Sequence, residues 1–284
     1  MTRKMKKSNT LHEYYTKKID KIHLGLRTVK QIPSEKNIHE LRVEIKHWRA
    51  VINLLKTIAP ANFTAFCHHN PLHKIFKLAG HVRELQINSQ LLIKCKFPNE
   101  LHAIYSSYST TNEAKYLNEL NKQITEFDYQ LLNRINKQVK RTIKSLNEIT
   151  IANEALIYIK TETAKTKEIL RPEYNHVIIH RIRTHLRSAN LCTAFTKAIK
   201  PSIQLAHYFN ALKKTAESIG KIHDNIVLIQ YLESSIIKTD QIQGKQLSVV
   251  LRAIEKFKKR NQAIYKNSKK EIESILKYNH RISL

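Results

Sequence analysis

Apolar residues recur every three or four positions along most of the chain, and lysine, arginine and other polar residues occupy the positions between them. This spacing is typical of amphipathic α-helices that bury one face against their neighbours. Only 4 glycines and 6 prolines occur in 284 residues, which disfavours a turn-rich β fold. The sequence therefore predicts an all-α protein, with helices near 9–31, 35–58, 64–95, 112–148, 151–169, 173–199, 202–237 and 242–279.

Landmarks of the first half of the chain return in the second half in the same order. A His-x-x-Arg-x-x-x-(Lys/Arg) motif occurs in each half, and a proline and a glycine follow each copy at nearly the same distances. We therefore expect two homologous four-helix units packed side by side, over residues 9–150 and 151–284, after a basic disordered tail at 1–8. The Ser/Thr-rich segment 98–111 has no counterpart in the second half, so we expect an inserted loop or short helix there.

The charge of the chain limits the class of its partner. Lysine and arginine number 50 and aspartate and glutamate 23, which gives a formal net charge of +27. Such a charge points to nucleic acid, an anionic membrane surface or another polyanion, or to a solvated basic surface without a specific ligand. No apolar run approaches the length of a membrane span, and the three cysteines form no CxxC pair. We therefore expect a cytoplasmic protein without a membrane segment or a metal centre.

Basic residues form stripes on several of the predicted helices. At about 100° per residue, the cations of the first motif fall within an arc of about 80°, separate from the apolar face and without a carboxylate. Three other helices repeat the spacing, with fewer cations in the second half. The four stripes are His39, Arg42, Lys46 and Arg49; His180, Arg183 and Arg187; Arg134, Lys137, Arg141 and Lys144; and Lys259, Lys266 and Lys269.

The residue types in these stripes suit a ligand with repeated phosphates. Arginine presents a planar fork that bonds phosphate oxygens in pairs, and lysine adds a mobile point charge. A histidine beside phosphate is favoured in its charged form. If the stripes converge, they line a groove or channel about three helical turns long.

The two motifs resemble those of the CHAD family, the conserved histidine α-helical domain, which carries H-x-x-R-x-x-x-[KR]-x-x-R in each of two repeats. Here the repeats run from His39 to Arg49 and from His180 to Arg187, and Asn190 stands where the last arginine would be. The downstream glycine segment of the family is similar to residues 80–84, which include Arg83, and to residues 220–224, where His223 replaces the arginine.

This resemblance implies two four-helix bundles related by pseudo-two-fold symmetry around a basic channel. It also implies that inorganic polyphosphate binds in that channel and that the domain itself is not catalytic. On this interpretation the four stripes and Arg83 bind polyphosphate, no cofactor is needed, and the protein is cytoplasmic. Association with polyphosphate granules or with a polyphosphate-metabolising enzyme follows as a further expectation.

Three other functions compete with this interpretation. A nucleic-acid-binding module would use the same charge on a phosphate backbone, but the stripes contain no aromatic residue for base stacking. A phosphate-cleaving enzyme would need a Gly-rich phosphate loop or an E-x-E-x-K strand motif, and neither occurs. A metal site at the motif histidines is disfavoured because cations surround them.

Overall fold

The computed structural model describes residues 10–66, 70–170, 175–238 and 244–279. Within these ranges the chain is helical and contains no strand, which confirms the all-α prediction. The expected tail at 1–8 lies outside the described residues. The elements are α1 (Thr10–Gln31), α2 (Glu35–Ile58), the 3₁₀ helix η1 (Pro60–Phe66), α3 (His73–Lys94), α4 (Asn99–Thr125), α5 (Tyr129–Ser145), α6 (Glu148–Ile169), α7 (His176–Ile199), α8 (Ile203–Lys238) and α9 (Gly244–Asn279).

Side-chain caps explain where several helices begin. Ser34 accepts a hydrogen bond from the backbone N–H of Asn37 and starts α2 at the predicted residue. Asn147 and Asn175 cap α6 and α7 in the same way. Each cap supplies an acceptor to a backbone donor that has no partner within the helix.

The region between α2 and α6 corrects two predictions. The helix expected at 64–95 begins at His73, after the 3₁₀ helix that ends at Phe66. The helix expected at 112–148 is two helices, and Asp128 starts the second by accepting from the N–H of Leu131. No proline or glycine marks this break, which is why the periodicity did not show it.

The segment 98–111 is also corrected, because it forms the first half of the long helix α4. Leu101, Tyr105 and Ser109, spaced four apart, are buried along one face of that helix. The hydroxyls of Ser109 and Thr111 donate to backbone carbonyls of the preceding turn. The Ser/Thr run is therefore compatible with a helix, because its hydroxyls bond back to the helix instead of breaking it.

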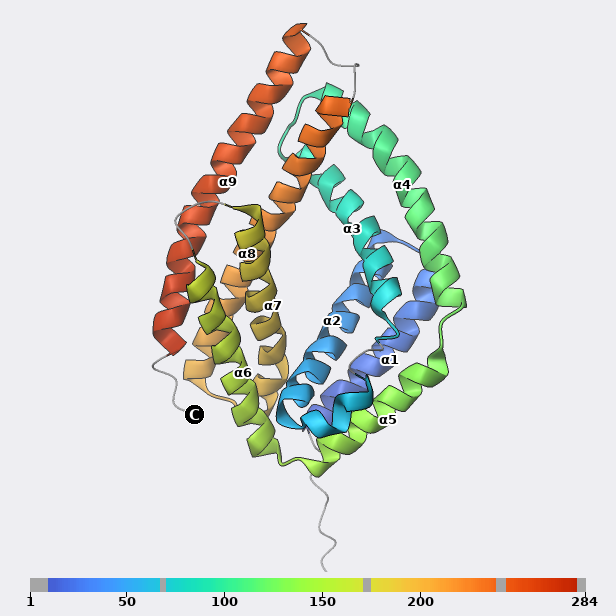
Figure 1. The fold of residues 1–284 in the computed structure, drawn as a ribbon, viewed down its shortest axis with the longest axis vertical. Helices are drawn as coiled ribbons and strands as arrows, with labels where there is room; N and C mark the ends of the chain where they lie inside the picture. Colours follow the sequence, from blue (N-terminus) through green and yellow to red (C-terminus); the bar gives the residue numbers. More distant parts are fainter. Residues whose placement is uncertain (1–9, 67–69, 171–174, 239–243, 280–284) are drawn as a thin grey trace, which may run out of the picture.

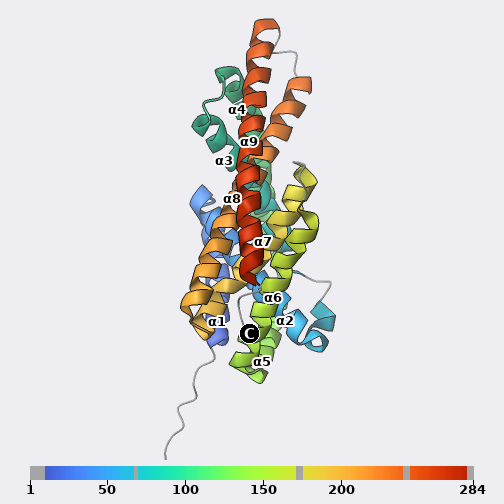
Figure 2. The same cartoon turned by 90° about the vertical axis from the view of Figure 1, so that its left-hand side faces the viewer.

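The helices form a flat, elongated molecule (Figures 1 and 2). Helices α6 to α9 lie on one side and α1 to α5 on the other (Figure 1). On the side formed by α6 to α9, α7 packs against α6 and α8, and α9 packs against both α8 and α6. Contacts of α2 with α7 and of α3 with α8 join the two sides.

Two hydrophobic clusters hold this arrangement together. The larger one runs through both sides and contains Trp48 and Tyr15 together with Phe195 and Leu186 of α7. The smaller one lies where the ends of α3 and α4 meet those of α8 and α9, and its members include Phe97 and Phe257, whose ring centroids are 5.1 Å apart. The central contacts of α2 and α3 with α7 and α8 therefore lie between two apolar clusters, which fixes the positions of the motif helices.

Candidate anion-binding site

The two motif helices, α2 and α7, pack against each other and bring their basic stripes together. Each helix buries an apolar face in the larger core, including Ile38, Leu41 and Ile45 on α2 and Ile182 and Leu186 on α7. The neighbouring positions on each helix carry the cations, which are only partly exposed. The apolar periodicity thus determines which way the basic residues face.

Arg42 is held tightly against helix α3. Its Nη1 donates to the backbone carbonyl of Phe76, and its guanidinium carbon lies 4.3 Å from the centre of the Phe76 ring. Nη1 of Arg42 also lies so close to Gly80 that a Cβ atom on residue 80 would be 2.7 Å from it. The glycine of the first half therefore makes room for the motif arginine.

Phe76 also contacts the last cation of the first stripe. The guanidinium carbon of Arg49 lies 5.1 Å from the centre of the same ring. An arginine over an aromatic face is attracted by the ring quadrupole. Phe76 therefore holds two arginines on one ring although they repel each other. No sequence pattern marks Phe76, because only the packing of α2 on α3 brings it to the motif.

In the second half, a carboxylate holds the motif arginine. Asp224 on α8 accepts from Nη2 of Arg183 at 3.4 Å. Next to it, His223 places Nε2 3.0 Å from Nδ1 of His180, and its own Nδ1 is 3.6 Å from Asp224. The two histidines and the ion pair form one connected group on α7 and α8.

In the first half, the corresponding residues are His39 and Arg83. Arg83 forms an ion pair with Glu35, which also accepts from Gln90 at 2.7 Å. Partial burial and the charges of Arg83, Lys46 and Arg42 lower the pKa of His39. The histidine is therefore neutral more often than a free one until an anion binds next to it.

Cations from both motif helices influence one another strongly. Burial, followed by the charges of Arg187 and Arg42, lowers the pKa of Lys46 to about 6. Burial and the charge of Arg183 also lower the pKa values of Arg42 and Arg187 to about 10, at which both stay protonated near neutral pH. Such repulsion among partly buried cations disfavours the folded state, and a polyanion would relieve it.

A small cavity lies where α2, α3, α7 and α8 meet. It has a volume of about 110 Å³ and is lined by cations and carboxylates together with apolar residues of α3 and α8. Glu84, Asp224 and the buried Asn88 add oxygen atoms to its wall, and Asn88 Oδ1 has no hydrogen-bond partner within the described structure. The lining residues with ionisable side chains are Arg42, Arg83, Glu84, Arg183, His223 and Asp224.

The other two predicted stripes lie elsewhere. Helix α5 packs on α1, α2 and η1 at the edge of the molecule (Figure 1), and its four predicted cations, Arg134, Lys137, Arg141 and Lys144, are exposed. Helix α9 lies at the opposite edge (Figure 1), with Lys259 and Lys266 exposed and Lys269 beside a groove between α6 and α9. Of the four stripes, those of α2 and α7 meet, and those of α5 and α9 stay on outer helices.

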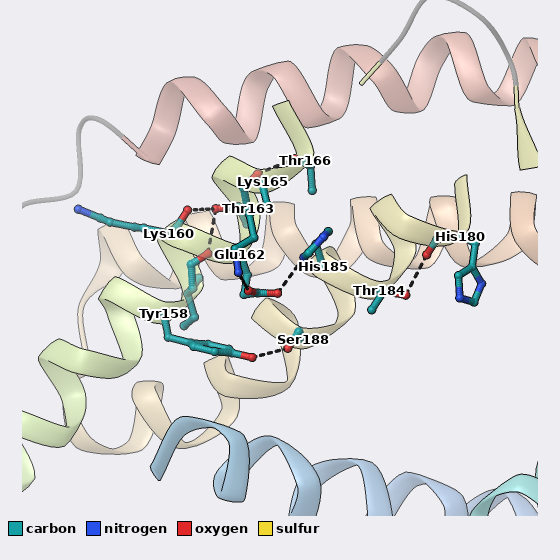
Figure 3. Close-up of polar contacts among 11 residues, drawn as sticks. Tyr158, Lys160, Glu162, Thr163, Lys165, Thr166, His180, Thr184, His185 and Ser188 are labelled. Atoms are coloured by element: carbon teal, nitrogen blue, oxygen red, sulfur yellow. Dashed lines mark hydrogen bonds and ion pairs between the residues drawn. The ribbon is translucent and has the colours of Figure 1, made fainter. Parts of the chain in front are cut away.

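A separate polar cluster lies between α6 and α7 (Figure 3). Glu162 accepts from Nζ of Lys165 at 2.6 Å and lies 3.0 Å from Nδ1 of His185. Figure 3 shows His185 directed toward Glu162, whereas His180 lies farther along the same helix and outside this cluster. His185 therefore helps to hold α6 and α7 together, and His180 remains available to the motif site.

Among the described residues, no group of three or more His, Cys, Asp or Glu side chains has an arrangement that holds a metal ion. None of the described helices combines the length and apolar character needed to cross a bilayer.

Comparison with known proteins identifies the family of this chain. The sequence model of the CHAD domain matches residues 14–233 of the chain. This match covers more than half of the chain, and the chain therefore belongs to the CHAD domain family. No curated protein sequence matches the chain.

The fold also has a solved counterpart. The crystal structure of the CHAD domain from the plant Ricinus communis superposes with a TM-score of 0.69. The two sequences are 14% identical, and the similarity covers 96% of this chain and 91% of the plant domain. At that identity the comparison establishes the shared fold.

Proposed function

We propose that this member of the CHAD domain family binds inorganic polyphosphate and does not itself catalyse a reaction. The ligand would lie in a basic channel between two homologous helical halves related by pseudo-two-fold symmetry. The observation that carries the proposal is the meeting of the α2 and α7 cations, with the pKa of Lys46 lowered to about 6 by burial and by Arg187 and Arg42. A linear polyanion would offset the mutual repulsion of these groups.

The form of the site favours polyphosphate over a nucleic acid. Arg42 and Arg49 both lie against Phe76, the aromatic ring beside the stripe, so a base would compete with two cations for that ring. The adjoining cavity, about 110 Å³, suits a slender chain of phosphates better than stacked nucleotides. Arginine forks and a lysine along a helix can each bond the oxygens of successive phosphates.

Nucleic acid binding is the second candidate, and the exposed stripe on α5 is the observation that favours it. Arg134, Lys137, Arg141 and Lys144 line one open helix face, which a phosphate backbone can reach without entering a cavity. Such contacts would be independent of base sequence and sensitive to salt. The two candidates therefore place the ligand on different helices.

A charge-reversal experiment separates these candidates. Titration calorimetry would measure the binding of long polyphosphate to the full chain, with single-stranded and duplex DNA as competitors. The double variant Arg42→Glu/Arg183→Glu should lose polyphosphate binding and retain its helical circular dichroism. The matched control, Arg134→Glu/Arg141→Glu, changes the net charge equally on α5 and should weaken binding only a few-fold through long-range electrostatics.

Two results would contradict the proposal. One is undiminished polyphosphate binding by the Arg42/Arg183 variant. The other is displacement of polyphosphate by DNA at equal phosphate concentration, together with a larger loss in the α5 variant than in the motif variant. Location in the cytoplasm, association with polyphosphate granules and contact with a polyphosphate-metabolising enzyme are parts of the same proposal, to be tested by fluorescence microscopy and co-purification.

A further inference from the structure

The two halves of the candidate site differ at one matched position. Three residues after the glycine that lies next to the motif arginine, the first half has Arg83 and the second half has His223. Both side chains line the same cavity between α2, α3, α7 and α8. One half therefore presents a permanent charge at this position, and the other presents an imidazole, which carries a charge only when it is protonated.

His223 does not stand alone, because it contacts the motif histidine of its own half. Nε2 of His223 and Nδ1 of His180 lie 3.0 Å apart, and the ring centroids are separated by 5.2 Å. The side chain of His223 is 18% exposed. The corresponding histidine of the first half, His39, instead experiences the charge of Arg83.

The contact between the two rings limits how many protons they hold. Two neutral imidazoles can form this hydrogen bond, and so can one imidazolium with one imidazole, because one nitrogen donates while the other accepts. Two imidazolium rings have donors on both sides of the contact and repel each other. The pair therefore takes up its first proton without losing the contact and its second only by separating.

Charged groups from each helix around the pair affect this titration. Arg183 on α7, Arg42 on α2 and Arg83 on α3 oppose a further positive charge, whereas Asp224 on α8 and Glu84 on α3 favour it. Burial, and then the nearness of His223 and Arg183, lower the pKa of His180. Without a ligand the pair is therefore kept short of protons, and an added polyanion shifts the balance toward proton uptake.

We propose that His180 and His223 form a proton-sharing pair that supplies, only when protonated, the cation that Arg83 supplies permanently in the other half. The inference rests on the proposed function and adds a regulation to it. The first half of the site binds polyphosphate over the whole physiological pH range. The second half binds it more strongly as the pH falls, and each binding event takes up protons at the pair.

The test compares the full-length protein with the variant His223→Arg, which gives the second half the residue of the first. Titration calorimetry with polyphosphate at constant ionic strength, at about pH 8 and about pH 6, gives the affinity. Repeating it in buffers of different ionisation enthalpy gives the protons taken up. On going from the higher to the lower pH, the natural protein should gain up to about tenfold more affinity than the variant does, as expected when a ligand raises one pKa by about one unit.

The variant should bind more tightly than the natural protein at the higher pH and about as tightly at the lower pH. It should also take up fewer protons. Lys46 and His39 titrate in both proteins, so the difference between the two proteins isolates the histidine pair. His207→Arg is the matched control, because it places the same charge on an exposed position of the same helix α8. It should leave the pH dependence unchanged.

Full pH dependence and unchanged proton uptake in His223→Arg would overturn this inference and leave the proposed function intact. Absence of polyphosphate binding at every pH would overturn both. An independent measurement needs no variant: NMR titration of the histidine ring protons in the natural protein. We expect the His180 and His223 signals to titrate together in two separated steps, and single independent titrations of the two rings would overturn the pair.

Discussion

Gly80 lies against Arg42 so closely that a Cβ atom at residue 80 would be 2.7 Å from Nη1 of the arginine. In the second half, the nearest atom to a Cβ on Gly220 is Nε of Arg183, at 4.0 Å. The first distance forces the guanidinium to move, and the second is ordinary van der Waals contact. The two matched glycines therefore differ in what they do for the arginine beside them.

Gly80→Ala should weaken polyphosphate binding without destabilising the fold. The atom in the way is the end of a flexible side chain, so Arg42 shifts away while the helix gains up to about 1 kcal/mol from alanine. We expect a several-fold loss of affinity by calorimetry and an unchanged or higher melting temperature. Gly220→Ala is the control, and it should raise stability similarly while retaining affinity. Equal affinities of the two variants would show that Gly80 has no such role.

Phe76→Leu should also lower affinity, because the ring beneath Arg42 and Arg49 is lost. Each cation–aromatic contact contributes about 0.5–1 kcal/mol at partly exposed sites, so the two arginines become less ordered. We expect a loss of several-fold in polyphosphate affinity, measured by calorimetry. Phe76→Tyr keeps the aromatic face and should restore binding. If the Phe76→Leu and Phe76→Tyr variants bind polyphosphate equally well, the ring acts only by filling space.

The stability of the ligand-free protein should rise with pH because of Lys46. Its pKa is lowered from 10.5 to about 6 by burial and by neighbouring cations. Between these two pKa values the unfolded chain therefore binds more protons than the folded chain. The destabilisation caused by the buried charge is complete below about pH 6, and it fades as the pH rises toward 10.5, the pKa of Lys46 in the unfolded chain.

The variant Lys46→Met isolates this contribution. It removes the titrating amine, so it should stabilise the fold most at low pH and progressively less at higher pH. Urea unfolding followed by circular dichroism at several pH values gives the free energies of unfolding. A stabilisation that is constant across the range would contradict the lowered pKa of Lys46. The same variant should bind polyphosphate more weakly, because it removes a cation of the motif.

A buried polar group formed by Tyr15, Trp48 and Asn136 should be important for stability. Asn136 Oδ1 accepts from the Tyr15 hydroxyl at 2.6 Å and from Trp48 Nε1 at 3.3 Å, and the three residues connect α1, α2 and α5. Asn136→Ala leaves the buried Tyr15 hydroxyl without its acceptor, whereas Trp48 Nε1 still donates to that hydroxyl at 3.0 Å. The variant should cost about 1–3 kcal/mol.

Tyr15→Phe removes one donor and should cost only about 1 kcal/mol. Tyr129→Phe, at an exposed position on α5, is the control and should change stability by less than about 0.5 kcal/mol. Urea unfolding measures all three variants. Similar losses for Asn136→Ala and Tyr129→Phe would show that the buried group contributes little.

Local sequence patterns are enough to predict the helical class, most helix bounds and the side of each motif helix that carries cations. These features follow from short-range periodicity and from caps such as Ser34, which act within a few residues. The sequence did not predict the break at Asp128, because no proline or glycine marks it. It also did not predict that 98–111, expected as an inserted loop or short helix, belongs to the long helix α4, because that depends on burial of Tyr105. The family resemblance came from the same local motifs.

Which of the four basic stripes meet depends on how the helices pack against one another. Periodicity along one helix fixes the direction of its side chains but contains no information about which helix lies opposite. The contact of α2 with α7 brings Arg42 and Arg183 together, whereas α5 and α9 pack elsewhere. The contacts of Phe76 with Arg42 and of His180 with His223 likewise join distant parts of the chain. They exist because the apolar faces of the helices, once buried in a shared core, determine where the remaining polar groups lie.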